Sequence, residues 1–129
     1  MRNLFQSGQF VLSSGAVSPW KIECDALTEH DVETIAAMLF PVLMPFSSVE
    51  GVPQGGLRLA EAMRVYQSAG EGGLLIVDDV LTTGGSMERQ RRGRAMAQGA
   101  VIFARQRPQP WITPLFQMTA TQKNRGVND

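Results

Sequence analysis

The chain has 129 residues, a length typical of one domain that can bury a proper hydrophobic core. Its composition is ordinary for a globular protein, with 43% hydrophobic and 19% charged residues. Twelve acidic residues balance twelve Lys and Arg residues, which excludes a global field that would attract the chain to nucleic acid or to a membrane.

The single cysteine, Cys24, excludes an internal disulfide and is typical of a reducing compartment. No apolar run approaches the ~20 residues that a membrane-spanning helix needs. The N-terminus lacks the apolar segment of a signal peptide. We therefore expect a cytoplasmic protein, with neither a membrane nor a nucleic acid as its partner.

A short hairpin is predicted near the N-terminus. Residues 10–12 are a strand candidate, and residues 13–15 (Ser-Ser-Gly) have the composition of a turn. Residues 20–24 alternate apolar and polar side chains, as a second strand does. These segments favour a small hood, residues 1–25, packed on a main sheet.

A helix is predicted from Thr28 to about Phe40. Thr28 followed by Asp31 matches a capping arrangement, and Pro41 ends or kinks the helix. One face is expected to be buried, because its apolar residues keep helical spacing: Val32, Ile35, Ala36, Leu39 and Leu43. The only histidine, His30, lies on the first turn with no partner group evident, which favours a surface side chain over a catalytic one.

The rest of the chain alternates strands with helices. The strands are predicted near 46–51, 74–78 and 100–105, and the helices near 57–68 and 86–98. This order predicts the α/β class, with a parallel sheet flanked by helices and joined by right-handed crossovers. Residues 111–118 are predicted to form an edge strand that tolerates Pro114. The domain is expected to span 1–118, with its core at 28–118, before a polar tail at 119–129.

Residues 74–86 carry the clearest chemical pattern. Four branched apolar residues, 74–77, predict a strand buried on both faces, and Asp78 and Asp79 follow where it leaves the sheet. Ligands bind at this carboxyl edge in open parallel sheets. The next five residues supply hydroxyl groups, glycine backbone and the start of a helix. This combination favours the binding of an oxyanion by Thr82, Thr83, Gly84, Gly85 and Ser86.

A phosphate-binding loop at residues 82–86 beside two carboxylates suits a phosphorylated ribose, whose vicinal hydroxyls donate to the carboxylates. The pattern is not a Walker A loop, because no Lys follows the glycines, and GxGxxG is absent. A structural alternative is a strand followed by an N-capped helix, with both acids solvated. The loop Gly51-Val52-Pro53-Gln54-Gly55-Gly56 is either a plain strand-to-helix turn or a second anion cradle, in which the N–H groups of residues 54–57 face a pyrophosphate.

Residues 74–86 closely resemble the phosphoribosyl-diphosphate motif of type I phosphoribosyltransferases. Residues 51–56 resemble the loop that holds pyrophosphate in that family, and residues 8–20 are similar to the hood of orotate phosphoribosyltransferases. The resemblance implies transfer of a phosphoribosyl group from 5-phosphoribosyl 1-diphosphate to a nucleobase, orotate or a similar pyrimidine. It also implies Mg²⁺ as a cofactor, with no dedicated protein metal site, and a homodimer.

The same resemblance implies roles for individual residues. Asp78 and Asp79 are expected to be the catalytic pair that holds the ribose hydroxyls, and residues 82–86 to hold the 5′-phosphate. The pyrophosphate is expected at Pro53, Gln54, Gly55 and Gly56. The base is expected at Trp20, Ile22 and Arg105, where a planar guanidinium matches the carboxylate of orotate. For Arg105 the alternative is an ordinary surface side chain at a strand end.

The sequence departs from the family in two places. In the hood, a basic residue common in the family's turn is replaced near Ser13, and the paired aromatics after the proline become Trp20, Lys21 and Ile22. Only residues 69–72 stand where the family has a longer insertion with a mobile lid rich in Lys and His, and Lys21 and Lys123 are the only lysines. A catalytically weak nucleotide-binding regulator, or a subunit completed by a partner, is therefore the alternative function.

The predicted helix after Ser86 is basic, with Arg89, Arg91, Arg92 and Arg94. Such a run is typical of a solvated face. A dimer contact and an RNA-binding patch are the alternatives.

Overall fold

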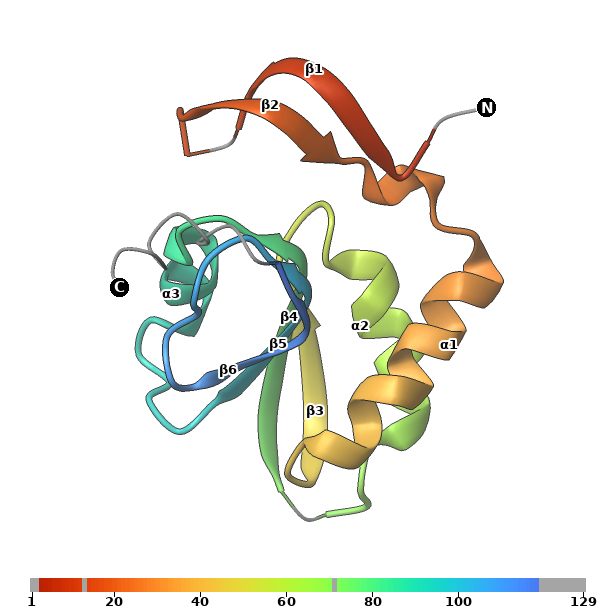
Figure 1. The fold of residues 1–129 in the computed structure, drawn as a ribbon. Coiled ribbons are helices and arrows are strands. Elements are labelled where there is room, and N and C mark those ends of the chain that lie inside the picture. Colours follow the sequence, from red (N-terminus) through yellow and green to blue (C-terminus); the bar gives the residue numbers. More distant parts are fainter. Residues whose placement is uncertain (1–2, 13, 71, 119–129) are drawn as a thin grey trace, which may run out of the picture.

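The computed structural model describes residues 3–12, 14–70 and 72–118 (Figure 1). The predicted tail, residues 119–129, lies outside the described residues, as do Ser13 of the predicted turn and Glu71 of the shortened connection. No helix within the described segments is long and apolar enough to cross a bilayer.

A four-stranded sheet forms the centre of the molecule, with the strand order β3-β4-β5-β6 and every neighbouring pair parallel. The strands are β3 (Phe46–Gly51), β4 (Gly73–Leu81), β5 (Gln98–Ala104) and β6 (Ile112–Gln117). The predicted α/β class and all four predicted strands are confirmed. β3 is paired only as far as Gly51 opposite Val77, whereas β4 continues alongside β5 to Leu81 opposite Ala104. β4, which carries the two acids, therefore projects beyond β3.

Helices cover both faces of this sheet (Figure 1). The helices α1 (Glu29–Leu39) and α2 (Leu57–Met63) pack on one face, and α3 (Gly85–Arg91) packs on the other. Successive residues of β4 point to opposite faces, so Leu75 and Val77 join the α1–α2 core while Ile76 joins the α3 core. All three are fully buried. This two-sided burial is the reason for the unbroken apolar run in the sequence.

The start of α1 agrees with the sequence prediction. The Thr28 hydroxyl accepts from the Asp31 amide at 3.0 Å, and the Asp31 carboxylate accepts from the Thr28 amide at 2.8 Å. The predicted capping arrangement is thus confirmed, and so is the predicted buried face at Val32, Ile35, Ala36 and Leu39. A 3-10 turn, Phe40–Val42, follows the helix at Pro41. His30 is exposed.

Two predicted helices are shorter in the structure. α2 ends at Met63 and continues only as a 3-10 turn, Arg64–Tyr66. The helix predicted to reach residue 98 ends at Arg91, because Gly93 has a φ of +81° and turns the chain. Gly99, the residue after the predicted end of that helix, lies in β5.

The N-terminal hood is an antiparallel hairpin of β1 (Phe5–Val11) and β2 (Val17–Ile22). Both bounds differ from the prediction: the first strand begins five residues earlier than predicted, and the second ends at Ile22, so that Cys24 begins a 3-10 turn leading to α1. Figure 1 shows the hairpin standing over the carboxyl edge of the main sheet. The Phe5 and Phe103 rings meet edge to face at 5.9 Å between centroids and help to fix the hood there.

Candidate active site

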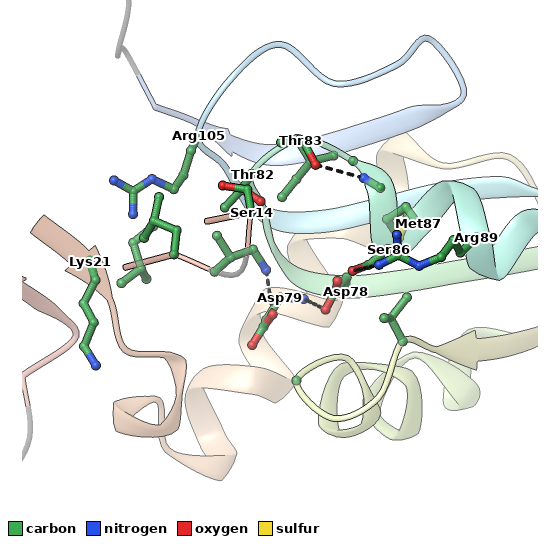
Figure 2. A pocket seen from close by; sticks show the side chains of 18 of the residues that line it. Ser14, Lys21, Asp78, Asp79, Thr82, Thr83, Ser86, Met87, Arg89 and Arg105 are labelled. Carbon is green, nitrogen blue, oxygen red and sulfur yellow. Dashed lines mark hydrogen bonds between the residues drawn. The ribbon is translucent and has the colours of Figure 1, made fainter. Parts of the chain in front are cut away.

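A cavity of about 530 Å³ lies at the carboxyl edge of β4, between the sheet and the hood (Figure 2). Its floor is formed by the end of β4 and by the loop of residues 82–86. Its other walls come from the loop that follows β3 and from the hood. Predicted site residues from all of these segments line it: Ile22, Pro53, Gly55, Asp78, Asp79, Thr82, Thr83, Gly84, Gly85, Ser86 and Arg105.

The two carboxylates occupy different environments. Asp78 is 8% exposed, and its Oδ1 accepts from the Asp79 amide at 2.8 Å. Asp79 is half-buried, and its Oδ1 accepts from the Val80 amide at 2.7 Å. Burial, followed by the nearby charge of Asp79, raises the pKa of Asp78 well above its ordinary value. The pair therefore holds a proton at pH values where two free aspartates would both be ionised.

The loop of residues 82–86 presents backbone amides. The Gly84 φ is +89°, a left-handed conformation that favours glycine. The Gly85 amide donates to the Thr83 hydroxyl at 3.2 Å. Within the described part of the chain, the amides of Thr83, Gly84, Ser86 and Met87 have no protein acceptor. Because α3 has only seven residues, these loop amides, rather than a long helix dipole, supply the capacity to bind an anion.

The loop after β3 is closed more tightly than the sequence predicted. The Gly56 amide donates to the Val52 carbonyl at 2.7 Å, and the Leu57 amide donates to the Gln54 carbonyl at 3.1 Å. Two of the four amides expected to face a ligand are thus occupied. The amides of Gln54 and Gly55 have no acceptor among the described residues. Gln54 and Gly56 do not line the cavity.

Gly55 lies directly against Asp79. A β-carbon added at Gly55 would stand 2.2 Å from Asp79 Oδ2, so a side chain there would displace the Asp79 carboxylate. The absence of a side chain lets the backbone of the loop after β3 lie against the Asp79 carboxylate of β4.

An aromatic ring of the hood holds in place the cation that follows β5, Arg105. The Arg105 guanidinium lies 3.4 Å from the centre of the Trp20 ring, and its Nη2 donates to the Ser18 hydroxyl at 2.8 Å and to the Trp20 carbonyl at 3.3 Å. Arg105 lines the cavity, but Trp20 does not. Trp20 is therefore placed to support Arg105, whereas Ile22 reaches the cavity itself.

Several lining residues were not predicted. Lys21 lines the cavity from the hood, where its Nζ pairs with Glu23 at 3.1 Å and lies over the Phe10 ring. Arg89, which the sequence assigned to a solvated face, also lines the cavity and donates to the Ser86 hydroxyl at 3.3 Å. Its spacing of three residues from Ser86 places both on one helix face, a signal that was present in the sequence. Figure 2 shows Lys21 and Arg89 on opposite sides of the carboxylate pair.

The sole cysteine lies near the same carboxylates. Burial, followed by the charge of Asp79, raises the pKa of the Cys24 thiol. A thiol kept protonated is a poor nucleophile, so the cavity offers no activated cysteine.

Solved structures with a similar arrangement of elements include orotate phosphoribosyltransferases. The chain superposes on the enzyme from Aeropyrum pernix with a TM-score of 0.71 at 21% identity, over 98% of this chain and 94% of that one. The chain has a phosphoribosyltransferase fold. The Francisella tularensis orotate phosphoribosyltransferase matches with a TM-score of 0.61 at 15% identity, over 97% of this chain and 86% of that one.

A longer protein also contains this phosphoribosyltransferase fold. Leishmania donovani UMP synthase matches with a TM-score of 0.69 at 18% identity, over 89% of this chain but 34% of that one. Neither a protein-family model nor a curated protein sequence matches the chain. The resemblance seen in the sequence is thus confirmed at the level of the fold.

The raised pKa of Asp78 predicts how stability depends on pH. The folded protein holds a proton that the unfolded chain releases near pH 4, so the unfolding free energy should fall as the pH rises through neutrality. The slope is at most about 1.4 kcal/mol per pH unit. Asp78→Asn should flatten this dependence, as measured by urea unfolding between about pH 5 and pH 8.

The exposed Glu33→Gln on α1 is the matched control and should leave the slope unchanged. Parallel pH profiles for the wild type and Asp78→Asn would contradict the assignment of a raised pKa to Asp78.

Proposed function

We propose that the protein transfers the phosphoribosyl group of 5-phosphoribosyl 1-diphosphate to a nucleobase of the orotate type and releases pyrophosphate. The observation that supports this most is that one cavity gathers the four groups such a reaction needs. They are the carboxylate pair, the loop of residues 82–86, the loop after β3 and Arg105.

The reaction is a displacement at the anomeric carbon. The bond from this carbon to the pyrophosphate oxygen breaks, and its electron pair leaves with pyrophosphate. A base nitrogen forms the new bond from the opposite face, and the proton of this nitrogen is released to water. Because the carbon is cation-like between these events, no protein nucleophile is needed, and the protein acts by positioning and by electrostatics.

The carboxylate pair would hold the two ribose hydroxyls. A protonated Asp78 can both donate and accept hydrogen bonds, and the Asp79 carboxylate accepts them. The charge of the pair also lies where positive charge develops on the sugar. The amides and hydroxyls of residues 82–86, with Arg89 beside Ser86, would hold the 5′-phosphate. The amide of Gly55 would hold the pyrophosphate next to Asp79.

Mg²⁺ fits this arrangement as a companion of the substrate. Among the described residues, no group of three or more His, Cys, Asp or Glu side chains is gathered to hold a metal by itself. Mg²⁺ is commonly bound through one or two carboxylates, phosphate oxygens and waters, and Asp78 and Asp79 beside the pyrophosphate loop supply that donor set. When bound, the ion would neutralise charge on the departing pyrophosphate.

Arg105 supports an anionic base. Its Nη2 is used by the hood, whereas no described residue accepts from its other guanidinium nitrogens. Those nitrogens can pair with a carboxylate such as that of orotate.

A second chain would fit on the hood. Val11 and Val17 are paired at the tip of the hairpin and are 75% and 65% exposed, which is unusual for apolar strand residues. We therefore include a homodimer in the proposal, with the hood tip at its interface.

The alternative is a nucleotide-binding regulator, or a subunit completed by another protein. The observation that favours it is the short connection of residues 67–72 between the 3-10 turn after α2 and β4, where the resembled family carries a longer insertion with a mobile lid. Lys21 is the only lysine among the described residues. Water exclusion and extra cations would then have to come from elsewhere.

Turnover tests the enzyme against the regulator. Wild-type protein should release pyrophosphate from 5-phosphoribosyl 1-diphosphate only when a base is added, and orotate should be the best of a panel of bases. Asp79→Asn keeps the acceptor for the Val80 amide but loses the charge, so kcat should fall about 10²-fold. Glu33→Gln serves as the control. Tight nucleotide binding by calorimetry without base-dependent turnover would support the regulator instead.

Arg105 should determine the preference for a base that carries a carboxylate. Arg105→Gln should raise the KM for orotate about 10-fold or more and reduce the preference for orotate over uracil, because the bidentate pairing is lost. The exposed Arg107→Gln, two residues away, should change neither. An unchanged ratio of kcat/KM for orotate and uracil would refute the role of Arg105.

Light scattering tests the homodimer. The wild type should show twice the mass of one chain, and Val17→Glu should shift the protein toward the monomer because it places a charge at the hood tip. Met96→Glu, at a 93% exposed site outside the hood, should leave the mass unchanged. A monomeric wild type at micromolar concentration would exclude this part of the proposal.

A further inference from the structure

The segment between β5 and β6 binds three consecutive carbonyls of the loop that lines the cavity. The Arg105 amide donates to the Leu81 carbonyl at 2.8 Å. The Gln106 side-chain amide donates to the Thr82 carbonyl, and the Gln109 side-chain amide donates to the Thr83 carbonyl at 3.2 Å. The two glutamines therefore continue, with side chains, the pattern of bonds that the backbone begins at the end of β4.

These bonds orient the amides of the loop. In a planar trans peptide the carbonyl and the following N–H point in opposite directions. Carbonyls of Thr82 and Thr83 that are bound by the glutamines therefore direct the N–H groups of Thr83 and Gly84 to the other side. Residues 82–84 line the cavity and neither glutamine does, so this other side is the cavity. Both N–H groups lack a protein acceptor among the described residues.

Gln109 also fits closely against Gly84. A β-carbon added at Gly84 would stand 2.3 Å from Gln109 Oε1 and 2.4 Å from Nε2. Among the described residues, Oε1 of Gln109 is buried and has no hydrogen-bond partner. An acceptor buried without a partner is unfavourable, so an apolar side chain of similar length would suit the fold at least as well. The donor Nε2 is what distinguishes glutamine at this position.

We propose that Gln106 and Gln109 are positioning residues, which hold the amides of Thr83 and Gly84 toward a bound phosphate. The proposal rests on the proposed function, because it assigns the 5′-phosphate of the substrate to this loop. Neither glutamine contacts the phosphate, and both act through the backbone of the loop. Nothing in the 82–86 pattern itself shows this contribution, since it comes from a different segment of the chain.

Ribose 5-phosphate, titrated by calorimetry against the full chain, tests the role directly. Gln106→Met and Gln109→Met should each weaken binding about 5- to 10-fold, the effect of losing one orienting hydrogen bond. The KM for 5-phosphoribosyl 1-diphosphate should rise by a similar factor, with the KM for the base unchanged. The thermal midpoint of Gln109→Met should not fall, because the unpartnered acceptor is removed together with the donor.

Gln117→Met is the matched control. Gln117 also donates to a backbone carbonyl at this edge, that of Ala104 at 3.3 Å, but it does not reach the loop of residues 82–86. This variant should bind ribose 5-phosphate as the wild type does. In the ligand-free protein, hydrogen exchange of the Thr83 and Gly84 amides should accelerate in Gln106→Met and Gln109→Met and not in Gln117→Met.

The outcomes separate the two proposals. Wild-type affinity for ribose 5-phosphate in both single variants and in the double variant would overturn the positioning role alone. Weaker binding accompanied by a matching loss of thermal stability would also overturn it, because it would show a merely structural role. Wild-type protein that binds ribose 5-phosphate but shows no turnover would overturn only the enzyme. Wild-type protein that binds no ribose 5-phosphate would overturn both.

Discussion

The hydrogen bond from the Val52 amide to the Val77 carbonyl, 2.9 Å long, fixes the point at which β3 leaves the sheet while β4 continues. The arrangement of the two loops at the carboxyl edge depends on this difference in length between β3 and β4. The loop after β3 folds back beside the projecting end of β4, and Gly55 comes to rest on the Asp79 carboxylate. Two segments that are more than twenty residues apart thereby become adjacent walls of one cavity. A larger residue at Gly55 would displace the Asp79 carboxylate, because that carboxylate already occupies the space.

Charge in the cavity is distributed around the acidic pair. Lys21 and Arg105 lie on the hood side, and Arg89 lies beside the loop of residues 82–86 (Figure 2). The proton held by Asp78 reduces the repulsion between the two acids and lets them remain in contact. Such a site suits a ligand that carries anionic groups at its ends and hydroxyls between them. This complementarity is specific to the cavity, since the whole chain carries no net charge.

Arg105 connects the cavity to the hood. It stacks on Trp20 and donates to Ser18, both on β2, while its own backbone amide binds the end of β4. One residue thus ties three parts of the molecule together at the rim of the cavity. Part of the hydrogen-bonding capacity of this guanidinium holds the hood, and only the remainder can serve a ligand in the cavity. This shared use explains why Trp20 supports the site from behind instead of lining it.

Local sequence determined the strands, the capping of α1 and the chemistry of both loops, because each depends on neighbouring residues: the apolar run before Asp78, the Thr28–Asp31 pair and the glycines. It overestimated the helix after Ser86, since Gly93 turns the chain before the helical pattern is exhausted. It also missed Lys21, Gln106 and Gln109, because these positions acquire meaning only from segments far away in the chain. Tertiary structure alone decided which loop amides remain free, which arginine of α3 faces the cavity and which aspartate is buried. Those properties depend on packing across the sheet edge and not on any local pattern.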